Sequence, residues 1–115
     1  MIKIIGTVVR GKQKGRQLGF PTANVEIKNI DLEQGIYAGT IIVGGKKHGC
    51  AVYYSGEKFI EAFIFDFSED LYGKEVIVEV LEKIRDKQIF ETKAEAIEQI
   101  TKDTTAIKEL LRKLG

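Results

Sequence analysis

The only proline of this 115-residue chain is followed closely by two polar side chains that could bind a metal ion. Pro21 precedes Thr22 and Asn24, which are two residues apart at the start of a strand-like segment, residues 22–27. Because side chains alternate between the two faces of a strand, the Thr22 hydroxyl and the Asn24 amide share one face. Both are neutral oxygen donors of the kind that Mg²⁺ prefers, and Pro21 fixes φ at a strand entrance where no ladder donor is needed. The pair predicts a magnesium site; a Thr/Asn turn cap is the alternative interpretation.

A glycine-rich, cationic segment, residues 11–19, leads into this proline. Its three glycines allow backbone N–H groups to turn toward one point, as they do in anion-binding nests. The segment has no Gly-Lys-Ser/Thr of a Walker loop, and an exposed hairpin tip would have a similar composition. Beside a pair of oxygen ligands, however, an anion cradle is what a Mg²⁺–nucleotide site requires. The residues predicted to bind the nucleotide are Gly11, Lys14, Gly15, Gly19, Pro21, Thr22 and Asn24.

A single carboxylate interrupts the apolar run FIEAF at residues 59–63. Strand alternation places Glu61 on the same face as Phe59 and Phe63. A carboxylate among apolar side chains loses hydration, which raises its pKa and makes it a better base. Glu61 is therefore a candidate base, and an edge-strand glutamate paired with a neighbouring lysine is the alternative interpretation.

Composition narrows the chemistry that these residues can perform. Lys and Arg number 18 against 17 Asp and Glu, and this near-balance argues against bulk attraction to nucleic acid or membranes. One cysteine, Cys50, and one histidine, His48 in a turn-like run, exclude a disulfide framework and a Cys/His zinc site. Catalysis must then depend on carboxylates, hydroxyls, backbone amides and a borrowed metal ion. With no signal-peptide pattern and no apolar run of membrane-spanning length, we expect a soluble, cytoplasmic protein.

Strand-like segments with intervening turns precede a helical C-terminal part. A Thr-x-x-Glu capping box at Thr92 predicts the start of one helix, and Asp103 or Thr104 predicts the cap of a second. This order of elements predicts a mainly β fold, a small six-stranded antiparallel barrel with C-terminal helices on one flank. Because the chain has the length of one ordinary core, we expect a single domain over residues 1–115. The predicted strands are residues 2–10, 22–27, 36–43, 49–54, 59–67 and 75–84.

The motifs of this chain also resemble those of a known family. The sequence GRQLGFPTAN at residues 15–24 is similar to the signature of riboflavin kinases, including the kinase half of bacterial bifunctional FAD synthetases. In the same order follow GIYAG at 35–39, EAFIFDFSEDLYGKEVIVE at 61–79, IRDKQIF at 84–90 and QITKD at 99–103. This ordered set covers nearly the whole chain.

The resemblance implies a Greek-key barrel that phosphorylates the ribityl 5′-hydroxyl of riboflavin with ATP and Mg²⁺, forming FMN. It implies that Thr22 and Asn24 bind Mg²⁺ and phosphate, and that Glu61 serves as the general base. It also implies that the segment 11–19 closes over the nucleotide and that Arg85 helps to cover the flavin. We expect riboflavin/FMN and ATP/ADP as partners, no nucleic-acid or membrane partner, and a monomer.

The chain departs from the family pattern in three places. Residues 51–56 lack the usual Ala-Asn-Ile-Gly and Pro-Thr-Phe stretches, Phe63 replaces a histidine, and Lys87 replaces an acidic residue. Two alternatives to the kinase stay open: a flavin- or nucleotide-binding barrel without turnover, and a small barrel that binds single-stranded RNA. The near-neutral net charge argues against RNA binding.

Overall fold

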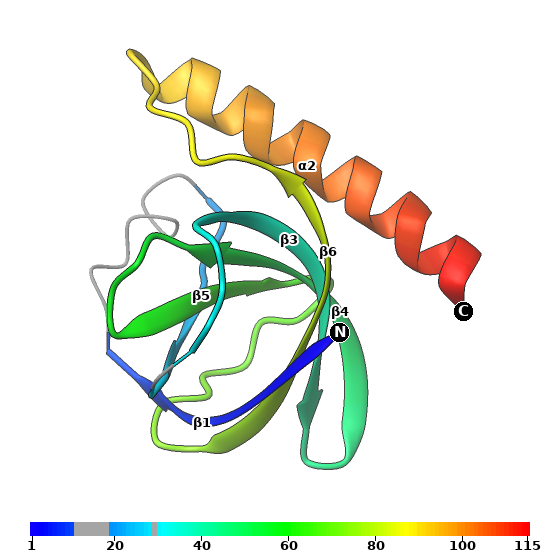
Figure 1. Ribbon diagram of the computed structural model, residues 1–115. Helices are drawn as coiled ribbons and strands as arrows, with labels where there is room; N and C mark the ends of the chain where they lie inside the picture. Colours follow the sequence, from blue (N-terminus) through cyan, green and yellow to red (C-terminus); the bar gives the residue numbers. More distant parts are fainter. Residues whose placement is uncertain (11–18, 29) are drawn as a thin grey trace.

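The computed structural model describes residues 1–10, 19–28 and 30–115, and in these ranges six strands close into a barrel flanked by one helix (Figure 1). The strands follow the order β1-β2-β5-β4-β3-β6 around the barrel, and every neighbouring pair is antiparallel. Because β2 lies beside β5 while β3, β4 and β5 follow one another, the connection is a Greek key. The predicted six-stranded antiparallel barrel is confirmed. The elements are β1 (Ile2–Val9), β2 (Ala23–Glu26), β3 (Gly35–Val43), β4 (Lys46–Tyr54), β5 (Phe59–Ile64), β6 (Glu75–Arg85) and α2 (Lys93–Leu114).

Glycine determines where the β3–β4 hairpin turns. Gly44 and Gly45 have φ values of 55° and 82°, the left-handed region that a two-residue type I′ turn requires. The strands pair directly on either side of this turn, so β4 begins at Lys46, three residues earlier than predicted. His48 is consequently a strand residue and not a turn residue as predicted, and its ring contacts Phe67 with 5.0 Å between centroids.

Alternate strand residues point into the barrel and fill it. On the three strands β2, β5 and β4, the inward residues Val25, Ile60 and Val52 are completely buried. Cys50 belongs to the same core, and burial raises the pKa of its thiol to about 12, so it acts as a small apolar core residue. Because side chains alternate, the neighbours of these inward residues along each strand face outward.

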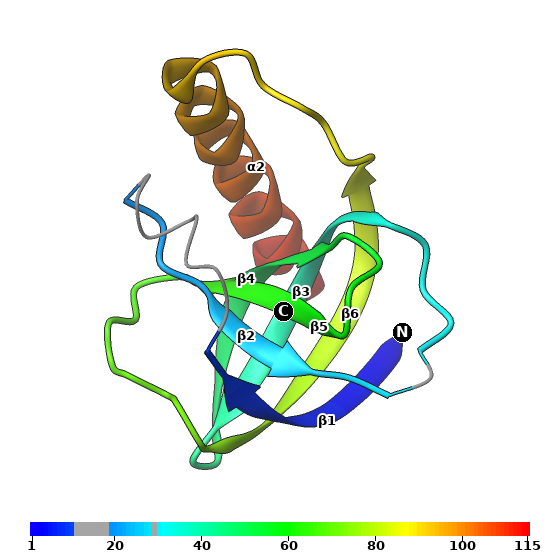
Figure 2. The ribbon, with the colours of Figure 1, turned by 90° about the vertical axis from the view of Figure 1, so that its left-hand side faces the viewer.

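α2 packs on the outer face of β3 and β4, where small residues allow it to approach closely (Figure 2). Ala38 and Ala51 are partners in the β3–β4 register, and both are completely buried in a second cluster with Ile107 of α2. At Gly49 an added Cβ would lie 2.8 Å from Leu111 Cδ1, so a larger residue here would require the Leu111 side chain to shift. The barrel therefore has two apolar layers, one inside it and one beneath the helix.

The prediction of two C-terminal helices was wrong, because α2 continues over 22 residues. The first cap was predicted correctly: Thr92 Oγ1 accepts a hydrogen bond from the Glu95 amide at 3.1 Å. The predicted second cap, Asp103 or Thr104, lies inside the helix. The Thr104 hydroxyl donates to the Ile100 carbonyl at 2.9 Å, a bond to the preceding turn of the same helix.

A single stripe of buried residues explains why α2 is continuous. Ala96, Asp103 and Ile107 are its buried residues, and they recur at helical spacing through both predicted halves. The carboxylate on this stripe interrupted the apolar period and resembled a cap in the sequence. In the described ranges no helix combines the length and the apolar character needed to cross a membrane.

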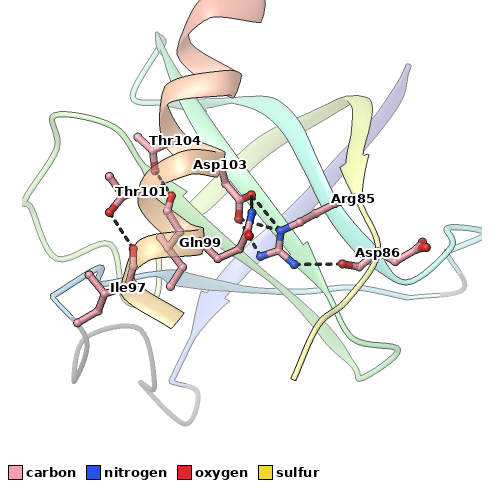
Figure 3. A network of polar contacts seen from close by, with 8 residues as sticks. Arg85, Asp86, Ile97, Gln99, Thr101, Asp103 and Thr104 are labelled. Carbon is pink, nitrogen blue, oxygen red and sulfur yellow. Dashed lines mark hydrogen bonds and ion pairs between the residues drawn. The ribbon is translucent and has the colours of Figure 1, made fainter. Parts of the chain in front are cut away.

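The buried carboxylate of α2 is held by an arginine at the end of β6 (Figure 3). Arg85 Nε donates to Asp103 Oδ1 at 2.9 Å and to Oδ2 at 3.1 Å, and Arg85 Nη2 donates to Oδ2 at 2.8 Å. Gln99 Nε2 donates to Oδ1 at 2.9 Å. Because Asp103 is only 2% exposed, this bidentate pair compensates the loss of its hydration and ties α2 to the barrel.

We expect Asp103→Leu to lower the free energy of unfolding by about 3 kcal/mol, because it leaves the Arg85 guanidinium without its buried partner. The double variant Arg85→Leu/Asp103→Leu should recover part of this loss, since neither charge is then buried alone. Urea denaturation followed by circular dichroism measures both values.

Lys102→Ala is a control on the same helix, because it removes only an exposed ion pair with Glu98. The urea concentration at which half of Lys102→Ala is unfolded should stay close to that of the unmodified protein. If Asp103→Leu were no more destabilising than Lys102→Ala, the ion pair would not be what holds α2 in place.

Candidate functional site

The candidate site lies on the outer face of the barrel, where three neighbouring strands place polar residues side by side. In the register, Asn24 of β2 lies opposite Glu61 of β5, and Glu61 lies opposite Tyr53 of β4. The next residues along these strands point into the core, so these three side chains point outward. With strands about 4.8 Å apart, the row spans about 10 Å.

Three side-chain oxygens in or beside this row are buried without a hydrogen-bond partner among the described residues: Thr22 Oγ1, Asn24 Oδ1 and Tyr53 Oη. Thr22 directly precedes the first residue of β2, and it lines the same pocket as Asn24. An unpaired buried polar atom costs about 1–3 kcal/mol. These are all the unpaired buried side-chain nitrogen and oxygen atoms in the described part of the chain, and two of the three residues, Asn24 and Tyr53, are the cross-strand neighbours of Glu61. Their grouping marks the place where a ligand would complete their interactions.

Glu61 occupies the centre of this row and is half-buried. It also acts on the neighbouring tyrosine. The pKa of the Tyr53 hydroxyl is raised, first by burial and then by the carboxylates of Asp103 and Glu61, while Arg85 opposes the rise. Tyr53 therefore lies within electrostatic reach both of the base candidate and of the Arg85–Asp103 pair beneath α2.

An aromatic contact supports the segment that carries Thr22. The Phe63 ring meets Phe20 edge-on with 5.3 Å between centroids, and it meets Phe65 in the same way at 5.7 Å. Phe20 directly precedes Pro21, so this contact fixes the chain where it enters β2. From the sequence Phe63 is identified only as a departure from the family pattern, because its partner Phe20 lies on another part of the chain.

A pocket of about 250 Å³ opens beside the unpaired oxygens of Thr22 and Asn24. It lies between the end of β1, the entrance of β2 and the turn after β5. On another part of its wall the Arg10 guanidinium lies over the Tyr72 ring, 4.2 Å from the centroid. Glu61 does not line this pocket but lies next to it, as the cross-strand partner of Asn24.

The predicted phosphate-binding segment lies partly outside the described residues. Gly11, Lys14 and Gly15 are not among them. Gly19 has a φ of 88°, a left-handed conformation that favours glycine, and both Gly19 and Pro21 are exposed. The roles assigned to these five residues stay predictions.

Arg85 lies at the end of β6, and its guanidinium is engaged by other residues of the chain. Besides its bonds to Asp103, Nη1 donates to the Asp86 carbonyl at 3.0 Å, and the Phe90 ring lies 5.9 Å from Cζ. A contact between Arg85 and a flavin stays a prediction.

The oxygens of Thr22 and Asn24 fit a metal ion that is bound partly by the phosphate oxygens of a substrate. Among the described residues no group of three or more His, Cys, Asp or Glu side chains could hold a metal ion. Thr22 and Asn24 instead offer two buried, unpaired neutral oxygens. A small hard cation such as Mg²⁺ commonly takes few protein ligands and completes its shell with water and substrate phosphates.

Comparison with known proteins identifies the family. The model of the riboflavin kinase family (Flavokinase) matches residues 1–111. The RNA-binding riboflavin kinase RibR of Bacillus subtilis is 38% identical over 124 residues, which cover 100% of this chain and 54% of that protein. A bifunctional riboflavin kinase/FMN adenylyltransferase of Buchnera aphidicola is 32% identical over 120 residues, covering 95% of this chain and 38% of that protein. The crystal structure of riboflavin kinase from Trypanosoma brucei has a TM-score of 0.69 and 25% identity, covering 96% of this chain and 80% of that chain.

The chain thus spans about half the length of the first relative and 38% of the second. The family match, by contrast, extends through all six strands and most of α2. The chain belongs to the riboflavin kinase family.

Proposed function

We propose that this chain transfers the γ-phosphoryl group of ATP to the ribityl 5′-hydroxyl of riboflavin, forming FMN and ADP. The observation that carries this proposal is the row Asn24–Glu61–Tyr53, in which buried unpaired oxygens flank a half-buried carboxylate. Membership of the riboflavin kinase family supports the choice of substrate. The row supplies the groups that phosphoryl transfer needs.

Glu61 is the proposed general base. It accepts the proton of the 5′-hydroxyl while that oxygen forms a bond to the γ-phosphorus. The bond from this phosphorus to the β,γ-bridging oxygen breaks, ADP leaves, and the proton passes from Glu61 to solvent. A positioned base contributes about 10²–10⁴-fold, and positioning and charge neutralisation contribute most of the remainder.

Thr22 and Asn24 are the proposed protein ligands of a divalent ion, which we take to be Mg²⁺. Their unpaired oxygens are the reason for this assignment. When bound, the ion neutralises charge on the β- and γ-phosphates. Because both ligands are uncharged, we expect the ion to bind mainly together with the nucleotide.

The pocket beside Thr22 and Asn24 is the proposed place for part of the nucleotide. Thr22 and Asn24, whose oxygens are assigned to the metal, line this pocket, and Asn24 is the cross-strand neighbour of Glu61. Phosphates bound beside these two oxygens would therefore lie at the end of the pocket nearest Glu61. The additional phosphate contacts that the sequence predicts are Gly11, Lys14, Gly15, Gly19 and Pro21.

Arg85 and the adjoining end of β6 are proposed to border the flavin. The support is their position, since Arg85 acts on the hydroxyl of Tyr53, the neighbour of the proposed base. Because three of its five N–H groups are engaged by Asp103 and Asp86, two remain for a ligand.

Two other functions, binding of flavin or nucleotide without turnover and binding of RNA, lead to different expectations from those of a kinase. A barrel that binds flavin or nucleotide without turnover would use the same contacts but form no FMN. RNA binding belongs to the name of the B. subtilis relative, of which this chain spans 54%. A net charge of +1 gives this chain no general attraction for RNA, so we propose riboflavin/FMN and ATP/ADP as partners of a cytoplasmic monomer.

Glu61→Gln should reduce the rate of FMN formation about 10²–10⁴-fold, because glutamine keeps the shape of the side chain but cannot accept the proton. Nucleotide affinity should change little, since Glu61 does not line the nucleotide pocket. Chromatographic detection of FMN after incubation with riboflavin, ATP and Mg²⁺ measures the rate, and calorimetry measures nucleotide binding.

Glu26→Gln is the matched control, because Glu26 is an exposed glutamate two residues along β2 from Asn24 and on the same face. It should leave FMN formation unchanged. Equal activity of Glu61→Gln and the unmodified protein would exclude Glu61 as the base, and absence of FMN with every nucleoside triphosphate would favour the non-catalytic barrel.

Thr22→Val should weaken Mg²⁺-dependent nucleotide binding about tenfold, through loss of one oxygen ligand. Without ligands its melting temperature should be unchanged or higher, because the variant removes a buried unpaired hydroxyl and keeps the side-chain shape. Calorimetry with ATP, with and without Mg²⁺, and thermal denaturation measure the two effects.

Thr40→Val is the contrasting control, because the Thr40 hydroxyl donates to Glu79 at 2.7 Å. It should lower the melting temperature and leave nucleotide binding unchanged. A Thr22→Val variant that behaves like Thr40→Val would show that Thr22 has a structural role only.

A further inference from the structure

We propose that Tyr53 is a specificity-determining residue on the acceptor side of the site. Its hydroxyl binds the hydroxyl of the substrate's polyol chain that neighbours the phosphorylated one. This inference rests on the proposed function, because it takes Glu61 as the base that fixes the position of the reacting hydroxyl.

The order of the strands assigns Tyr53 to the acceptor. Asn24, with Thr22 beside it, lies on the β2 side of Glu61, and Tyr53 lies on the β4 side. In phosphoryl transfer the attacking and leaving oxygens lie on opposite sides of the phosphorus. If the phosphates are held on the β2 side, the acceptor extends from Glu61 toward Tyr53.

The Tyr53 hydroxyl has a hydrogen bond left to make. It is buried and unpaired among the described residues. The nearby Asp103 carboxylate does not satisfy it, since both of its oxygens accept from Arg85 and one also accepts from Gln99. The raised pKa of Tyr53 keeps the phenol protonated, so it can donate as well as accept.

Packing does not explain the hydroxyl. The Tyr53 ring packs on the apolar layer beneath α2 with Ala51 and Phe65, and a phenylalanine ring would fill the same space. The hydroxyl adds the cost of a buried unpaired oxygen to this packing. The two other oxygens in this condition, on Thr22 and Asn24, are assigned to ligands, and the same explanation applies to the third.

A polyol is the chemistry that fits this position. Glu61 and Tyr53 are cross-strand neighbours, so they reach adjacent groups of one extended ligand. Next to a reacting hydroxyl, a polyol presents a second hydroxyl, which can accept from Tyr53 and donate to it. The hydroxyl is covered in the ligand-free chain, so acceptor binding must shift a neighbouring group to reach it.

The test combines Tyr53→Phe with an acceptor that lacks the neighbouring hydroxyl, 4′-deoxyriboflavin, which keeps the 5′-hydroxyl. With riboflavin, Tyr53→Phe should lower kcat/KM about tenfold, mainly by raising KM for riboflavin, and leave KM for ATP unchanged. The unmodified protein should lose a similar factor with 4′-deoxyriboflavin. The two changes together should cost no more than either alone, because they remove the same hydrogen bond.

Tyr37→Phe is the matched control, because the Tyr37 hydroxyl donates to the Glu33 carbonyl at 2.6 Å. It should lower the melting temperature and leave KM for riboflavin unchanged. Tyr53→Phe should show the reverse pattern, with an unchanged or higher melting temperature in the absence of ligand. A Tyr53→Phe variant with unchanged kcat/KM, or with losses that multiply with those of the deoxy acceptor, would overturn the proposal.

Direct binding separates this proposal from the proposed kinase activity. Quenching of riboflavin fluorescence reports affinity without turnover. If the unmodified protein binds riboflavin but forms no FMN, the kinase proposal fails, while a tenfold loss of affinity in Tyr53→Phe would still support the contact. If it neither binds nor phosphorylates riboflavin, both proposals are wrong.

Discussion

The hydrogen-bond register of β5 between β2 and β4 is the constraint on which the candidate site depends. It places Glu61 opposite Asn24 on one side and opposite Tyr53 on the other. A slip of one residue would turn Glu61 into the core and expose its apolar neighbours, so the buried interior of the barrel enforces the register. The closed barrel strengthens this constraint because it has no free edge along which β5 could slide.

The candidate polar row lies on the outer face of the barrel, and two other parts of the fold form walls beside it. One wall is α2, which lies on β3 and β4 and is tied to β6 by the Arg85–Asp103 pair. Another is the entrance of β2, where Phe20 rests against Phe63. Both contacts join segments distant in the sequence, and both lie beside the polar row. The fold thus places the apolar core in the interior and the candidate polar row on the covered outer surface.

The unpaired oxygens of Thr22, Asn24 and Tyr53 are a local conflict between stability and function. Each lowers the stability of the ligand-free chain, and none has a hydrogen-bond partner among the described residues. In the proposed reaction such groups would be oriented before the ligand arrives, and phosphoryl transfer depends mainly on positioning. A ligand that satisfies them would also stabilise the folded chain, since it binds the native state and not the unfolded one.

The sequence by itself determined the local features of this protein. The glycine turn before β4, the six strands and the outward alternation of Glu61 with the core residues beside it follow from periodicity and turn chemistry over a few residues. Tertiary structure alone decided which strands became neighbours, and therefore that Asn24 and Tyr53 flank Glu61. It also decided that Asp103 is the buried partner of Arg85 and not a helix cap, which makes α2 one helix. The physical reason is that pairing across the barrel and burial beneath α2 depend on residues far apart in the chain, and local patterns carry no record of them.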